Sequence, residues 1–141
     1  MSNYSIVKNG DDMDRFFKTK QKFINQWLRY FASDLSKTQL DRYVKGQYIW
    51  HIFSFNLITN VFLEGDAARK AFNQADKRNC ICCDIFGDGG VIDDLPSWCD
   101  SAERIDEQFV EFYVISNDYS WTYIKTHEGD LCGPYFLKVE N

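Results

Sequence analysis

The sequence FVEFYVISNDYSWTYIKT, residues 109–126, decides the class of fold. Its two ends, residues 109–116 and 121–126, are rich in aromatic and β-branched side chains, as β-strands are. Between them the residues NDYS supply the turn chemistry of a hairpin. A further strand-like run at 135–139 follows a Gly-Pro pair. The last third of the chain therefore predicts an antiparallel meander of three strands.

The first third of the chain predicts helices. Apolar side chains recur at helical spacing over residues 11–31. Ser36 with Gln39 three residues later matches a capping box for a second helix, and Asp66 is placed to cap a third. Helices first and a meander last predict an α+β fold, with N-terminal helices packed on a mainly antiparallel sheet and a C-terminal β-meander. Because no repeat or linker interrupts the sequence, residues 1–141 are expected to form a single domain.

Two apolar runs in the middle of the chain predict buried strands. The first, YIWHIFSF at 48–55, contains β-branched and aromatic residues and no acid, and its pattern alone does not separate a buried strand from a buried helix. The second is NCICCDIF at 79–86. A helical turn is predicted near Glu103, in the polar stretch that follows.

Charge is distributed unevenly along the chain, whose net charge is −5. Residues 88–111 contain eight acidic residues and a single arginine. Such a block repels phosphate backbones, so no nucleic-acid partner is expected, and a basic protein partner suits it better. Asp93, Asp94 and Asp100 are the candidate acidic partner surface. The alternative is that the block is simply a solvated loop and helix face.

The five cysteines predict a reducing compartment. Their number is odd, and Cys80, Cys82 and Cys83 crowd one short segment, which does not suit a disulfide framework. Charged residues interrupt the first thirty positions, so neither a secretion signal nor a membrane segment is expected, and the predicted location is cytoplasmic. The cysteine spacing differs from that of structural zinc sites, so no metal and no cofactor is predicted.

Several short motifs resemble an uncharacterised bacterial family, domain of unknown function 4275. They are WHIFS at 50–54, EGDAA at 64–68, Tyr113-Val114, Asp118, WTYIKTHE at 121–128 and GPYF at 133–136. The likeness covers roughly residues 48–136, and WTYIKTHE is its most specific part. The resemblance implies a bacterial, cytosolic origin. It brings no established activity with it.

Candidate binding residues cluster in the strand that contains this motif. Strand alternation places Trp121, Tyr123, Lys125 and His127 on one face, which combines large rings with polar tips as binding surfaces do. Glu128 lies at the strand end, and the other imidazole of the chain is His51. The alternative is that Trp121 and Tyr123 complete the core while Lys125 and His127 lie at its edge.

A catalytic set is not evident in the sequence. A Cys132/His127 pair can be drawn, but Glu128 would point away from His127 on a strand and would not orient it. The sequence therefore predicts a non-enzymatic protein-interaction or regulatory module, of which an immunity-type protein that neutralises a toxic partner is one form. The alternative is a small-ligand-binding domain or enzyme with a site around His127. The oligomeric state stays open.

Overall fold

The fold is built on one six-stranded antiparallel sheet. The computed structural model describes residues 10–44, 48–86, 90–92, 95 and 97–139. The strands lie in the order β1-β6-β5-β4-β2-β3. Their bounds are β1 Phe62–Glu64, β2 Ile81–Asp84, β3 Gly90–Ile92, β4 Phe112–Ile115, β5 Trp121–Lys125 and β6 Tyr135–Lys138. The α+β fold and its C-terminal β-meander are thus confirmed.

The hairpin between β4 and β5 forms as its sequence predicts. Phe112 pairs with Lys125 and Ile115 with Thr122. The Ser116 hydroxyl closes the turn by accepting hydrogen bonds from the backbone N–H groups of Ser120 and Trp121, at 2.9 and 3.0 Å. Polar turn side chains therefore satisfy backbone groups that the strands leave unpaired at the tip.

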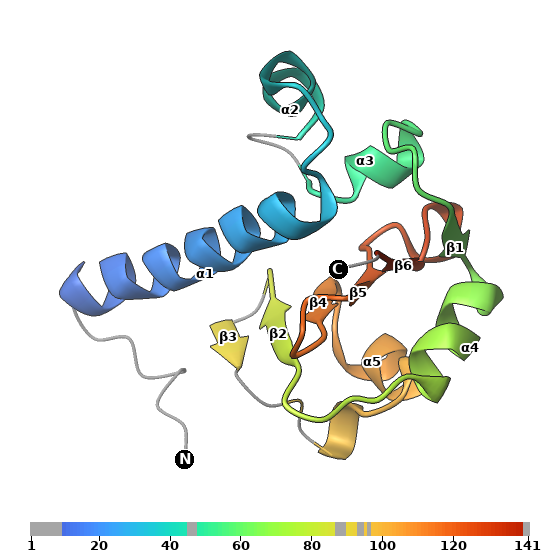
Figure 1. The fold of residues 1–141 in the computed structure, drawn as a ribbon. Coiled ribbons are helices and arrows are strands. Elements are labelled where there is room, and N and C mark those ends of the chain that lie inside the picture. The colour runs from blue at the N-terminus through green and yellow to red at the C-terminus, as the bar shows by residue number, and fades with distance from the viewer. Residues whose placement is uncertain (1–9, 45–47, 87–89, 93–94, 96, 140–141) are drawn as a thin grey trace.

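Helices cover both faces of the sheet (Figure 1). They are α1 Gly10–Phe31, α2 Lys37–Tyr43, α3 His51–Ser54, α4 Asp66–Gln74 and α5 Ala102–Gln108. Helices α1 to α3 lie on one side of the sheet and α4 and α5 on the other. Among the described residues, no helix has both the length and the apolar character needed to cross a bilayer.

Each face of the sheet has its own core. On the α1 side, the fully buried Trp27 donates a 2.8 Å hydrogen bond from its indole N–H to the Thr122 hydroxyl, which in turn donates to the Val114 carbonyl. On the α4 side, the Phe72 ring stacks on Tyr123 with 4.3 Å between ring centroids. Strand alternation sends Thr122 and Tyr123 to opposite cores, as expected for a sheet that is covered by helices on both faces.

Two local predictions are wrong. Residues 48–55 contain a turn and the short helix α3 rather than a strand, because Ile49, Ile52 and Phe53 are all buried and that spacing suits a helix. The N-cap of α4 is Gly65, not Asp66, whose carboxylate instead pairs with Arg69 at 2.8 Å. The capping box of Ser36 and Gln39 is confirmed at the start of α2.

Candidate functional site

Glu111 is a carboxylate with no exposure to solvent, located directly before β4. Its Oε1 atom accepts hydrogen bonds from the Trp50 indole N–H at 3.1 Å and from the His127 backbone N–H at 3.0 Å. The same oxygen is 2.8 Å from His127 Nδ1, and Oε2 accepts the hydroxyl of Tyr113. An ionised carboxylate only accepts hydrogen bonds, so four donors of this kind suit its charged form.

Strand register brings these groups together. Because Phe112 pairs with Lys125, the residue before β4 and the residues after β5 meet at one end of the sheet. Tyr113 lies two residues beyond Glu111, and side chains two apart on a strand share a face. Trp50 comes from the turn before α3, which packs over the same end. The site therefore joins three segments that are far apart in sequence.

Tyr113 is a stable donor to this carboxylate. Burial, followed by the nearby negative charge of Glu111, raises the pKa of the Tyr113 hydroxyl well above its ordinary value. The hydroxyl therefore keeps its proton at physiological pH and can donate it to Oε2.

The His127 ring lies at the edge of an aromatic cluster. Its centroid is 4.8 Å from that of Tyr48, 5.5 Å from Phe86 and 5.7 Å from Trp50. The side chain is 27% exposed. Since Nδ1 donates to the Glu111 carboxylate, Nε2 is the nitrogen left for other partners, and it is 3.6 Å from Glu128 Oε1. The name His127 site is used below for His127, Glu111, Glu128 and the rings of Tyr48, Trp50 and Phe86.

His51 contacts two of the same rings. Its Nδ1 is 2.8 Å from the Tyr43 carbonyl, which can only accept, so Nδ1 carries the proton there too. The ring is nearly perpendicular to Trp50 and Tyr48, at 4.7 and 5.8 Å between centroids. The fold thus brings the two imidazoles of the sequence to one aromatic cluster.

The predicted binding face of the β5 strand is divided between two places. Trp121 and Tyr123 are buried in the core beneath α4, where Trp121 also stacks on Phe136. Lys125 donates a hydrogen bond to the Val110 carbonyl at 3.2 Å. Strand β5 ends at Lys125, so His127 lies in the following turn and contacts the cluster on the α1 side instead. The alternative expectation, that Trp121 and Tyr123 complete the core, is the one the structure shows.

Glu111 is the residue that sequence reasoning missed. It was counted in the acidic block of 88–111, whereas its neighbours Val110 and Phe112 mark it as an acid inside an apolar strand-like run. A single acid in such a run is a signal for a buried, partnered carboxylate. The expectation that Glu128 points away from His127 is wrong, because β5 ends at Lys125 and Glu128 Oε1 lies 3.6 Å from His127 Nε2. The side chain that contacts Nδ1 is Glu111.

The acidic block is only partly exposed. Asp93 and Asp94 lie outside the described residues, and Asp100 is an exposed residue 3.4 Å from Arg104. Asp106 pairs with Arg69 of α4 at 3.0 Å. Part of the block therefore serves contacts within the fold.

The five cysteines are thiols, and four of them are buried. Burial raises the pKa of Cys83 and of Cys99 to about 12, so neither is a thiolate at physiological pH. In the part of the chain that the structure describes, no three His, Cys, Asp or Glu side chains are grouped as metal ligands.

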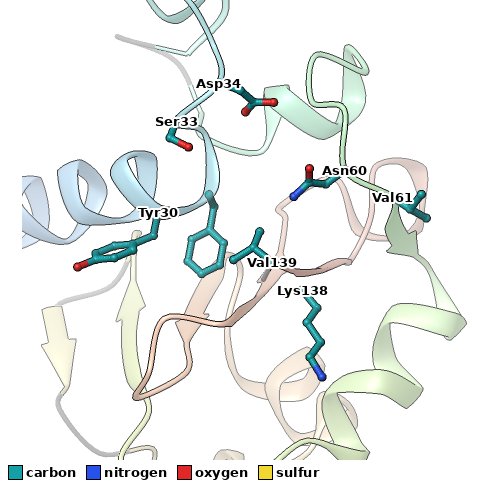
Figure 2. Close-up of a pocket in the computed structure, with 8 residues that line it drawn as sticks. Tyr30, Ser33, Asp34, Asn60, Val61, Lys138 and Val139 are labelled. Carbon is teal, nitrogen blue, oxygen red and sulfur yellow. The ribbon is translucent and has the colours of Figure 1, made fainter. Parts of the chain in front are cut away.

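Two surface cavities lie at the opposite end of the sheet. One, of about 640 Å³, is lined by residues including Ser33, Asp34, Asn60 and Val139, whose side chains Figure 2 shows around it. The other has a volume of about 490 Å³. Its lining includes residues of the β4–β5 turn, residues at the end of α4, and Trp121 at the start of β5. Lys138 lines both cavities and pairs with Trp121 at the start of β5, whereas His127 follows the end of that strand.

Comparison with known families places this chain beside one of them. The model of a family described as Domain of unknown function (DUF4275) matches residues 8–136. Neither a curated protein nor a solved structure matches the chain.

Proposed function

The chain belongs to the family Domain of unknown function (DUF4275), and from the geometry of its His127 site we propose that it is a recognition module that binds a ligand group through His127. The supporting observation is the buried Glu111 carboxylate, which holds both the ring and the backbone of His127. His127 Nε2 is then presented at the edge of the aromatic cluster in a fixed orientation.

A structural role alone explains Glu111 poorly. Burying a carboxylate costs several kcal/mol before its partners compensate, and apolar replacements of buried ionic groups are often equally stable. Three of the four hydrogen bonds to Glu111 orient Trp50 and His127, which both reach the same cluster. We infer that the carboxylate serves to position these rings, as a carboxylate behind a functional imidazole orients it.

Acid–base catalysis is the second candidate function. A carboxylate on Nδ1 is the arrangement by which enzymes orient a histidine base, and His127 Nε2 could accept a proton from a bound molecule. Within the described residues, however, no serine, threonine or cysteine side chain is hydrogen-bonded to His127. The described part of the chain thus offers this histidine no hydrogen-bonded protein nucleophile, and recognition is the simpler proposal.

The wider roles are proposals of the same kind. A regulatory or immunity-type module in the cytoplasm is consistent with five thiols that form no disulfide. A basic protein partner is consistent with the net charge of −5.

The test is a binding survey by nuclear magnetic resonance of ¹⁵N-labelled protein. The probes are N-acetyl-arginine amide, spermidine, phenyl phosphate, N-acetyl-tryptophan amide and glucose, and the reporter is the Trp50 indole N–H. Recognition predicts a saturable shift of this signal with at least one probe, reduced in His127→Ala and unchanged in Glu107→Gln on exposed α5 surface. If no probe shifts the signal, the proposal fails. If the protein converts a probe to product and His127→Ala abolishes the conversion, the acid–base function takes its place.

A further inference from the structure

Two hydrogen-bond acceptors face each other at the open edge of the His127 site. His127 Nε2 and Glu128 Oε1 are 3.6 Å apart, and the two side chains are 27% and 44% exposed. With the ring proton on Nδ1, Nε2 has a lone pair and the carboxylate has only lone pairs. Building on the function proposed above, we propose that this pair binds a cationic nitrogen, an ammonium or guanidinium group, that donates to both atoms.

The spacing of the two acceptors supports this choice. At 3.6 Å they are too far apart for a hydrogen bond to each other, which needs about 2.7–3.2 Å. Two acceptor atoms at this distance repel each other unless a donor lies beside them. An ammonium group has three donors and a guanidinium has five, so either can contact both atoms at once.

Aromatic rings form the walls beside this pair. Phe86 is 50% exposed, and its ring is 5.5 Å from His127 and 6.2 Å from Tyr48 between centroids. Tyr48 is itself 4.8 Å from His127. Cations are attracted to the faces of such rings, and the attraction grows as water is removed. The rings would therefore favour a cation over a neutral donor of the same shape.

The charges around the site favour the same ligand. Glu111 lies behind the imidazole and Glu128 in front of it. An anionic group placed between Nε2 and Glu128 would meet two carboxylates at short range, which is unfavourable.

Binding at this pair should weaken as the pH falls. A proton on Nε2 would take the place of the ligand donor and would leave a positive imidazolium facing a positive ligand. The titratable groups that face His127 are Glu111 at Nδ1, Glu128 at Nε2 and Tyr48 beside the ring, with Tyr113 behind Glu111 and His51 beyond Tyr48.

The test uses the full chain and the Trp50 reporter with three probes. N-acetyl-arginine amide and spermidine should bind, phenyl phosphate should not, and Glu128→Gln should weaken cation binding about fivefold or more. Glu107→Gln is the matched control and should bind as the unmodified protein does. If N-acetyl-arginine amide binds more tightly than spermidine, the natural ligand is a basic side chain of a protein. If spermidine binds more tightly, the natural ligand is a free polyamine.

Three outcomes overturn the inference. Phenyl phosphate binding through His127, with no effect of either cation, refutes the ligand class and leaves the recognition function standing. Cation binding that is unchanged in Glu128→Gln, in a variant whose thermal unfolding matches that of the unmodified protein, refutes the bridging geometry. The absence of any response to all probes refutes the recognition function itself.

Discussion

The indole N–H of Trp50 donates a 3.1 Å hydrogen bond to the Glu111 carboxylate, across 61 positions of sequence. This bond ties the turn before α3 to the start of β4 inside a region that excludes water. The same oxygen also holds His127, so the position of the imidazole depends on both the helical layer and the sheet. The site is therefore sensitive to changes in either layer.

Replacing the buried carboxylate should destabilise the fold. In Glu111→Gln the amide N–H₂ group faces donors where a carboxylate accepted them, and leaving buried polar groups unsatisfied in this way costs about 1–3 kcal/mol. Urea denaturation measures the loss of free energy of unfolding. The exposed Glu107→Gln should change it by less than about 0.5 kcal/mol. If Glu111→Gln also lowered the free energy of unfolding by less than about 0.5 kcal/mol, the four hydrogen bonds to Glu111 would contribute little to stability.

Removing the Thr122 hydroxyl should also destabilise the protein. Thr122→Val keeps the shape of the side chain but leaves the buried Trp27 indole N–H and the Val114 carbonyl without this partner. An unsatisfied buried group costs about 1–3 kcal/mol. Equilibrium unfolding in urea would show the loss, with the exposed Thr38→Val as the control. Equal stability of the two variants would contradict this account of the α1-side core.

The core position of Trp121 separates packing from function. Its side chain is only 6% exposed and lies on the sheet face opposite the His127 cluster. Trp121→Ala should cost about 3–5 kcal/mol of unfolding free energy. Under conditions where the variant is folded, its response to the arginine probe should match that of the unmodified protein. Selective loss of probe binding in a stable Trp121→Ala variant would place the functional surface on the other face.

The buried thiols should be unreactive and should make stability depend on pH. Burial raises the pKa of Cys83 and Cys99 from 9.0 to about 12. The folded state therefore holds protons that the unfolded state releases between those values, so the stabilisation is complete below pH 9 and is lost as the pH rises towards 12. A thiol reagent at pH 8 should modify the half-buried Cys132 first, and five equivalents should react after denaturation. Rapid modification of Cys83 in native protein would contradict the burial argument.

The sequence pattern predicted the hairpin well because its strands are adjacent in the chain. Aromatic and β-branched runs around a polar turn predict strands β4 and β5 directly. Strands β1 and β3 have only three residues each. Such short segments become strands because they pair with a neighbouring strand, and the β-propensity of their own residues does not reveal them. The pattern of residues 48–55 predicts a strand where the structure has helix α3, because nearly every residue there is apolar and this hides the helical spacing.

The candidate site was predicted only in part. The sequence singled out His127, Glu128 and His51 by residue type. It could not show that the register of β4 and β5 places Glu111 beside His127, because that contact depends on tertiary structure. The prediction that His127 shares a face with Trp121 and Tyr123 is wrong for a related reason. Side chains alternate between the two faces only within a strand, and β5 ends before His127.

The tautomer of His127 tests the central claim most directly. Long-range ¹H–¹⁵N spectroscopy of the imidazole at about pH 8, where imidazoles are ordinarily neutral, identifies the protonated nitrogen. If Glu111 holds the ring as described, the proton is on Nδ1 and Nε2 has the chemical shift of an unprotonated nitrogen. In Glu111→Gln this preference should weaken. A His127 ring protonated on Nε2 in the unmodified protein, with Nδ1 bare, would contradict the account.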